Sequence, residues 1–300
     1  MKQFIPSSEH ARVLAECLDI PQQRPRVAIA LSEVGISGKT VWVRLPEGLI
    51  PMDATLEVHL AAHRRGIHMS RLEEVIAGLH DHAFSDLREY AMQLGGEMLL
   101  RQEAEAGRVR LRGRLPWLRT APVSGLTSVD SLDLRLDLRC AVNGKSPSFS
   151  MLFGVGVDHI TACPCTQAYN QVLFRTPQGG EECPLATHSQ RSRTVLMMES
   201  QDIITPSVNE LVSCLEEALH VTQDLLKRAD EAELVHASHA TPQFAEDAVR
   251  EVAGQVGQRF TGRLPDTSRV IIESLSLESI HIHDVCCRLE TRLGELADFR

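Results

Sequence analysis

Aromatic side chains are scarce in this sequence, and long apolar runs are absent. Phe, Trp and Tyr make up only 4% of the 300 residues, so the core must be mainly aliphatic and few rings are available for stacking on nucleic-acid bases. No stretch approaches the ~18 consecutive apolar residues of a membrane span, and the first residues lack the apolar segment of a secretory signal. We therefore expect a cytoplasmic protein that does not cross a membrane.

Basic charge is also in deficit. Lys and Arg number 31 against 40 Asp and Glu, which gives a formal net charge of −9. Such an acidic chain is a poor candidate for a non-specific binder of nucleic acid or of a membrane surface. An anionic substrate would need a local basic pocket, and the densest basic run is His63–Arg71.

Several well-known catalytic motifs are missing. The sequence has no Gly-rich phosphate loop, no dinucleotide-binding fingerprint and no Gly-x-Ser-x-Gly turn, which argues against a kinase, a dehydrogenase and a serine hydrolase. The eight cysteines do not have the spacing of a disulfide framework, so the close pairs are candidates for metal or catalytic chemistry. Metal-assisted hydrolysis by Cys, His and Glu groups is the leading chemistry that remains.

The hydrophobic pattern predicts an α+β protein with a repeated order of elements. At roughly 150 residues per domain, the length favours about two domains, and each half follows the order strand pair, two helices, strand pair. We predict an N-terminal arm at 1–25 and two tandem modules at 26–146 and 147–300. The predicted strands are 27–31, 41–43, 109–115, 132–142, 149–157, 193–198, 270–277 and 280–289, and the alternation of Leu56, Val58 and Leu60 is consistent with a further strand. The predicted helices cover 70–105, and two more begin at a Ser207–Glu210 capping box and at Thr241-Pro242.

Cys163-Pro164-Cys165 is the sharpest local feature. Proline favours an extended backbone here, and residues two apart in an extended chain face the same side. Both sulfur atoms would then reach one cavity, where a thiolate binds a metal ion and a second thiol acts as nucleophile or acid. The alternative is a pair of buried structural cysteines.

His281 and His283 form a second feature, because they share one face of the last predicted strand. Two such histidines serve as metal ligands, or as one ligand and one proton carrier. Glu278 has the opposite parity to His281, so a bulge or a turn must separate them if both serve one site. The alternative is a polar strand face in solvent.

Three further elements are weaker candidates. His188 and Arg191 lie just before a predicted strand. Asp230-Glu231 reads mainly as a solvated charged cap at a helix end. Glu246 lies early in its helix, where the helix dipole favours a carboxylate whatever its function.

Six motifs, taken together and in order, resemble the prokaryotic type IB GTP cyclohydrolases. The resemblance covers roughly residues 26–290. The motifs are Gly66-Ile67-His68-Met69-Ser70-Arg71, Ala121-Pro122-Val123-Ser124-Gly125-Leu126, Cys163-Pro164-Cys165, His188-Ser189-Gln190-Arg191-Ser192, Phe244-Ala245-Glu246-Asp247 and Glu278-Ser279-Ile280-His281-Ile282-His283-Asp284.

The resemblance implies a tunnelling fold of two tandem modules with antiparallel sheets, assembled as a homotetramer with sites at subunit interfaces. It implies hydrolysis of GTP at C8 to 7,8-dihydroneopterin triphosphate and formate, the first step of folate biosynthesis. One divalent metal ion (Zn, Mn or Fe) per site is implied, with the ligands Cys163, His188, Glu231 and His281.

The resemblance also implies the roles of the other site residues. Cys163, Cys165, Glu278 and His283 would be catalytic, Glu246 would anchor guanine, and Arg65, Arg71 and Arg191 are candidates for binding the triphosphate. The segment between Cys165 and His188 is longer than the family leads us to expect, and it contains Cys183. This insertion either lengthens a loop or displaces His188 from the site. Two alternatives are a relative that yields a different pterin phosphate and a non-catalytic purine- or pterin-binding protein.

Overall fold

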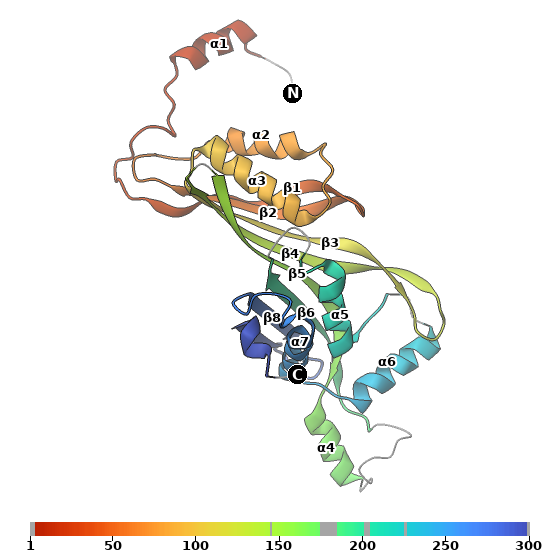
Figure 1. The fold of residues 1–300 in the computed structure, drawn as a ribbon. Coiled ribbons are helices and arrows are strands. Elements are labelled where there is room, and N and C mark those ends of the chain that lie inside the picture. Colours follow the sequence, from red (N-terminus) through yellow and green to blue (C-terminus); the bar gives the residue numbers. More distant parts are fainter. Residues whose placement is uncertain (1–3, 145, 175–184, 201–204, 225–226, 299–300) are drawn as a thin grey trace.

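The strands of this protein lie in one antiparallel sheet (Figure 1). The structure is a computed structural model and describes residues 4–144, 146–174, 185–200, 205–224 and 227–298. The order across the sheet is β1-β2-β3-β4-β5-β6-β8-β9, with the short β7 paired to β5. The strands are β1 (Leu31–Leu45), β2 (Gly48–Leu60), β3 (Ala106–Thr120), β4 (Thr127–Asn143), β5 (Ser146–Ala162), β6 (Ser189–Glu199), β7 (His220–Val221), β8 (Arg269–Ser276) and β9 (Val285–Arg292).

Helices cover one face of each half of the sheet. Helices α2 and α3 pack over the half formed by the first strands, and α5 and α7 pack over the half formed by β5, β6, β8 and β9 (Figure 1). Helix α1 stands apart from the sheet and has no buried residue. The helices are α1 (Ser7–Glu16), α2 (Met69–Leu79), α3 (Leu87–Gln102), α4 (Pro164–Leu173), α5 (Val208–Ala218), α6 (Arg228–Ala240) and α7 (Ala245–Phe260), followed by a 3₁₀ turn η1 (Leu293–Leu296).

β4 and β5 lie where the two predicted modules should separate. Each is 17 residues long, and they pair from Asn143 opposite Ser146 to Asp133 opposite Gly156. Because these strands are hydrogen-bonded to each other, both halves contribute to a single nine-stranded sheet. The predicted fold class, an α+β tunnelling fold of two tandem modules with antiparallel sheets, is therefore wrong. The domain boundaries at residues 25 and 146 remain predictions.

The core lies between the sheet and the helices, as the strand alternation indicates. Leu132, Leu134, Leu136 and Leu138 of β4 are all at most 3% exposed, which confirms that they share one face of the sheet. Helix α3 runs without a break through Gly95-Gly96. A Cβ atom at Gly95 would lie 3.1 Å from the Leu138 side chain, so glycine allows the helix to approach β4 closely.

The ends of some elements differ from the prediction. β1 is one continuous strand through Gly35–Gly38, with a register shift between Ile36 and Lys39, whereas the sequence predicted two separate strands at 27–31 and 41–43. Gly38 has φ +67°, a left-handed conformation that suits the irregularity. Helix α7 begins at Ala245 rather than at Thr241. The capping box that begins α5 is confirmed: Ser207 N–H donates to Glu210 at 3.0 Å, and Glu210 N–H donates to Ser207 Oγ at 3.3 Å.

The face of the sheet opposite the helices carries cross-strand ion pairs. Arg108 binds Asp137, Arg114 binds Asp133 at 3.0 Å, and Arg193 binds Asp158 at 2.9 Å. Each of these three guanidinium groups is paired with a carboxylate on a neighbouring strand.

Among the described residues, no helix combines the length and the apolar character that a membrane crossing requires.

Candidate active site

A cavity of about 290 Å³ is lined by residues that include the end of β5. Helix α4 projects from the same end of β5 (Figure 1). The ends of β5, β6 and β8, the loop after β8 and the start of α7 form the walls of the cavity. Six of the residues predicted for the site line it together: Cys163, His188, Glu246, Glu278, His281 and His283. The other lining residues are Ala162, Gln190, Gln243, Phe244, Ala245, Ser276 and Val285.

Cys163 and His188 are held opposite each other by the backbone. Cys163 follows the last residue of β5, and its N–H donates to the His188 carbonyl at 3.0 Å. The Thr187 hydroxyl donates to the Cys163 carbonyl at 2.7 Å. The long segment before His188 therefore leaves this histidine in the cavity. Cys183 lies in that segment, outside the described residues.

His281 and His283 lie in an irregular loop, not on a strand. β9 begins only at Val285, so the predicted strand at 280–289 starts five residues late. The His281 and His283 rings are stacked with centroids 5.3 Å apart, and the His188 and His281 rings meet edge to face at 6.3 Å. Glu278, just before this loop, lines the cavity together with the two histidines. This agrees with the expectation that a bulge or a turn separates Glu278 from His281 if both serve one site.

Glu278 is held by hydrogen bonds among side chains that line the cavity. Ser276 Oγ donates to the Glu278 carboxylate at 2.9 Å, and Gln190 Nε2 donates to Ser276 Oγ at 3.3 Å. His188 Nδ1 lies 3.1 Å from Gln190 Oε1. Sequence reasoning did not single out Gln190 or Ser276, although their alternation with His188 and Glu278 along the strand ends was available as a signal.

Glu246 lies in the first turn of α7 and points into the cavity from the side. The helix N-terminus, with its unpaired N–H groups, favours a carboxylate at this position. Asp247, the next residue, accepts the Phe244 N–H at 3.1 Å and caps the helix. Glu246 is thus left free of the capping role.

The donors in the cavity suit a divalent metal ion by their chemistry. A thiol, imidazole rings and a carboxylate are the ligands found for zinc and similar ions. Within the described parts of the chain, however, no group of three or more His, Cys, Asp or Glu side chains is arranged so that it could hold an ion as it stands. The chemistry of the donor set fits a metal, while its geometry here is not closed around one.

Five predicted residues do not line this cavity. Cys165 is the second residue of α4 and is exposed; because Pro164 begins the helix, the two sulfur atoms do not share the extended face that the sequence predicted. Glu231 is exposed in the first turn of α6. Arg191 is exposed on β6, and Arg65 and Arg71 lie by α2 in the other half of the sheet.

Asp230 was predicted to be a solvated cap, and the structure shows it buried. It is 1% exposed and accepts the N–H groups of Ser124 and Val123 at 3.0 and 2.9 Å, as well as that of Lys227 at 3.0 Å. These backbone donors, Ser124 first, hold the pKa of Asp230 well below its usual range. Asp230 thereby joins α6 to the Ala121–Leu126 motif, a contact between distant segments that local pattern does not reveal.

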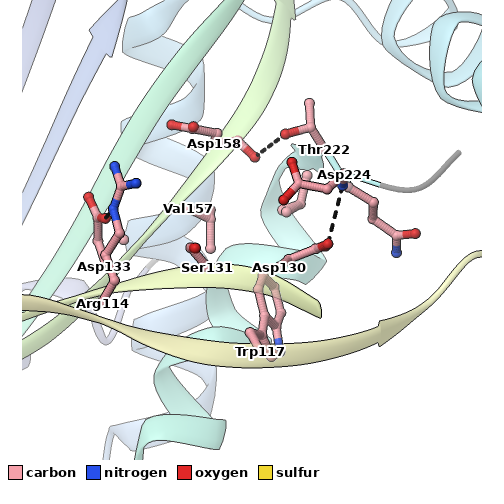
Figure 2. A pocket seen from close by; sticks show the side chains of 12 residues that line it. Arg114, Trp117, Asp130, Ser131, Asp133, Val157, Asp158, Thr222 and Asp224 are labelled. Atoms are coloured by element: carbon pink, nitrogen blue, oxygen red, sulfur yellow. Dashed lines mark hydrogen bonds and ion pairs between the residues drawn. The ribbon is translucent and has the colours of Figure 1, made fainter. Parts of the chain in front are cut away.

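A second cavity, of about 140 Å³, lies between β3, β4, β5 and the segment after β7 (Figure 2). Asp130, Asp133, Asp158 and Asp224 line it together with Arg114 and Trp117. Asp130 accepts the Asp224 N–H at 3.2 Å, and Asp133 binds Arg114. None of the predicted site residues lines this cavity.

Comparison with known proteins gives a consistent family assignment. The uricase of Arthrobacter globiformis aligns with 89% of this chain and 96% of its own chain, but its TM-score of 0.49 and 10% identity are too low to indicate a shared fold or function. The GTP cyclohydrolase MptA 2 of Methanocella arvoryzae is 29% identical over 301 residues, which is 93% of this chain and 97% of the relative. The GTP cyclohydrolase MptA of Methanoculleus marisnigri is 30% identical over 305 residues, 94% of this chain and 97% of that relative.

Residues 18–287 match the family described as type I GTP cyclohydrolase folE2. This match covers nearly all of the described fold and every residue that lines the candidate cavity. The chain belongs to this family and is a GTP cyclohydrolase, an enzyme whose substrate is GTP.

Proposed function

We propose that this protein is a type IB GTP cyclohydrolase that hydrolyses GTP at C8 to 7,8-dihydroneopterin triphosphate and formate, at the start of folate biosynthesis. The observation that supports this best is the cavity itself. It gathers Cys163, His188, Glu246, Glu278, His281 and His283 from four separate parts of the chain. Opening the imidazole ring of guanine needs an activated water molecule, proton carriers and a guanine anchor, and this set of side chains supplies a group for each need.

The proposed metal site uses Cys163, His188 and His281, which line the same cavity. A divalent ion bound there would lower the pKa of the attacking water molecule. Zn, Mn and Fe all accept such ligands. The fourth proposed ligand, Glu231, is on α6 and does not line the cavity of this chain. The His188 and His281 rings meet edge to face with centroids 6.3 Å apart, and sharing an ion would require these rings to rotate.

Glu246 is the proposed guanine anchor. The N1–H and the exocyclic amine of guanine present two parallel donors, which a carboxylate accepts with both oxygen atoms. Because Glu246 lines the same cavity as Cys163 and His188, a guanine anchored on it would occupy the space beside the sulfur atom and the imidazole ring. Glu278 and His283 would then hold and move protons at the ring nitrogens and the leaving formate, with Ser276 keeping the Glu278 carboxylate in place. Cys165, a proposed catalytic residue, is exposed in the first turn of α4.

A second copy of the chain is proposed to complete each site, in a homotetramer. No Arg or Lys appears among the described residues that line the cavity, yet a triphosphate needs cations to neutralise it. Arg65, Arg71 and Arg191 are the proposed source.

Apolar side chains beside the cavity support this assembly. Ile280 is 62% exposed and Ile282 is fully exposed, both in the loop that carries the two histidines, and Phe244 at the start of α7 is 39% exposed. Exposed apolar residues grouped around a site are typical of a surface that another protein covers.

The decisive experiment is incubation of metal-reconstituted protein with GTP, once with each candidate metal, while pterin absorbance and formate are measured. Mass spectrometry of the product tests the reaction in detail. A mass equal to that of 7,8-dihydroneopterin triphosphate supports the proposal. A different pterin phosphate would instead support the first alternative. Binding of GTP without formate release would contradict enzymatic activity.

A further inference from the structure

Gln190 contacts His188 directly and is connected to Glu278 through the Ser276 hydroxyl. Its Oε1 is 3.1 Å from His188 Nδ1. Its Nε2 is 3.1 Å from Thr161 Oγ1 and 3.3 Å from Ser276 Oγ. Residues 188 and 190 are two apart at the start of β6 (Ser189–Glu199), so their side chains lie on the same side of the chain. The Gln190 amide therefore connects His188 to Ser276, the last residue of β8.

The direction of each hydrogen bond follows from the carboxylate at one end of the chain. An ionised Glu278 can only accept, so the Ser276 hydroxyl must donate its one proton to it. Ser276 Oγ is then an acceptor toward Gln190, which places the amide NH₂ group on that side. The carbonyl Oε1 therefore faces His188, and a carbonyl only accepts. His188 must carry its proton on Nδ1, and the lone pair of its neutral ring is on Nε2.

The support beneath Gln190 is rigid. Thr161 Oγ1 also lies 2.7 Å from Ser192 Oγ, and the Thr161, Ser192 and Ser276 side chains are all at most 2% exposed. Buried hydroxyl groups that lose a partner pay a desolvation cost, so this arrangement resists rotation of the amide.

We propose that Gln190 is a positioning residue, which fixes the Nδ1–H tautomer of His188 and holds Glu278 in place through Ser276. The consequence is that the His188 Nε2 lone pair is ready for the reaction centre before substrate binds. The tautomer stands on the geometry alone; its use in holding a metal ion rests on the proposed function.

A neighbouring set of buried polar groups provides a matched control. His159, Thr194 and Ser274 are linked by bonds of 2.8 and 2.9 Å on the same strands, one step farther from the cavity. No hydrogen bond among the described residues joins this set to Gln190. A Thr194→Val substitution thus disturbs the same part of the sheet without touching the amide.

The tautomer can be measured directly in the metal-free protein. With ¹⁵N-labelled histidine, ring ¹H–¹⁵N correlations at a pH where the imidazole is neutral should show His188 as the Nδ1–H form in the wild type. Gln190→Ala should shift it to a mixture or to the Nε2–H form. Gln190→Glu keeps an acceptor for His188 but loses the donor to Ser276, so His188 should retain the Nδ1–H form in this variant. The same spectrum shows whether the fold tolerates a substitution at position 190.

Metal affinity and kinetics provide the second measurement. Competition with a chromophoric chelator should show affinity about 10- to 100-fold weaker in Gln190→Ala, the usual effect of losing a residue that orients a ligand. kcat should fall in a similar range while KM for GTP stays unchanged. Thr194→Val should leave the tautomer and the affinity as in the wild type.

Two results would overturn the proposal. One is a Gln190→Ala protein with the wild-type tautomer, and the other is an equal shift of the tautomer in Thr194→Val. If the wild type released no formate from GTP, the proposed function would fail while the tautomer measurement would still decide the role of Gln190.

Discussion

The backbone N–H of Cys163 donates to the carbonyl oxygen of His188 at 3.0 Å, so the sulfur and the imidazole are placed at one cavity by main-chain hydrogen bonds. This contact continues the β5–β6 ladder by one step beyond Ala162 opposite Ser189. The position of both side chains therefore depends on strand register, which the length of the intervening segment does not change.

Removal of the Cys163 thiol should abolish metal binding and turnover. In Cys163→Ala, formate release from GTP should fall at least about 100-fold, because metal assistance is worth several kcal/mol. The fold should be retained, since Cys163 is only half-buried at a strand end.

The control is Cys286→Ala, which should behave as the wild type. Cys286 is an exposed cysteine of β9 that does not line the cavity. Metal content after dialysis and a formate assay measure both effects. Full metal occupancy with full turnover in Cys163→Ala would remove this residue from the proposed metal site.

Glu246→Gln should weaken GTP binding. An amide offers one acceptor and sets its NH₂ group against a guanine donor, so one charge-assisted hydrogen bond is lost, worth about 1.5–3 kcal/mol. We expect KM for GTP to rise about 10- to 100-fold with a smaller change in kcat, measured by steady-state kinetics.

Asp247→Ala is the control for Glu246→Gln. It removes the cap on Phe244 N–H and should cost about 1 kcal/mol of unfolding free energy without a comparable change in KM. Equal KM values for Glu246→Gln and the wild type would show that guanine binds elsewhere.

His159 should make the protein sensitive to mild acid. Burial lowers the pKa of this fully buried ring from 6.5 to about 4, with a smaller lowering from His220 and an opposing contribution from Asp158. Below the unfolded pKa the unfolded chain binds a proton that the folded chain does not accept until about pH 4. Stability is thus complete above about pH 6.5 and declines as the pH falls toward 4, by about 2 kcal/mol at pH ~5.

Urea unfolding at neutral pH and near pH ~5 tests this, with His159→Gln as the comparison. The variant should be less stable at neutral pH, because the bond to Thr194 is perturbed, but should lose less stability on acidification than the wild type does. Parallel pH curves for the two proteins would mean that other groups cause the acid sensitivity.

Arg88→Ala should destabilise the whole fold. Arg88 is 1% exposed, binds Asp86 at 2.8 Å, donates to the Pro206 carbonyl at 2.8 Å, and its guanidinium lies 4.3 Å from the centre of the Phe153 ring. It thereby ties α3 in the first half to β5 and the start of α5 in the second. Removing one member of a buried ion pair costs about 3–5 kcal/mol, which urea unfolding will show. Arg250→Ala, at a side chain that is 74% exposed, should change stability little, and similar values for the two variants would contradict a structural tie at Arg88.

Local pattern predicted the features that neighbouring residues control. The alternation of leucines along β4 and the Ser207–Glu210 capping box depend on residues a few positions apart, and both are confirmed. The family resemblance joined Cys163, His188, Glu246 and His281 as one site, and the cavity contains all four. Local pattern alone left these motifs as separate candidates.

The amino-acid sequence by itself determined the position of most strands and helices, the family, and the residue types available for the chemistry. Only the tertiary structure decided that all strands form one sheet, that Pro164 starts a helix and turns Cys165 away from Cys163, that Asp230 is buried, and that Gln190 lies between His188 and Glu278. The physical reason is that periodicity and capping act within a few residues, whereas strand register, burial and side-chain hydrogen bonds depend on segments far apart in the chain.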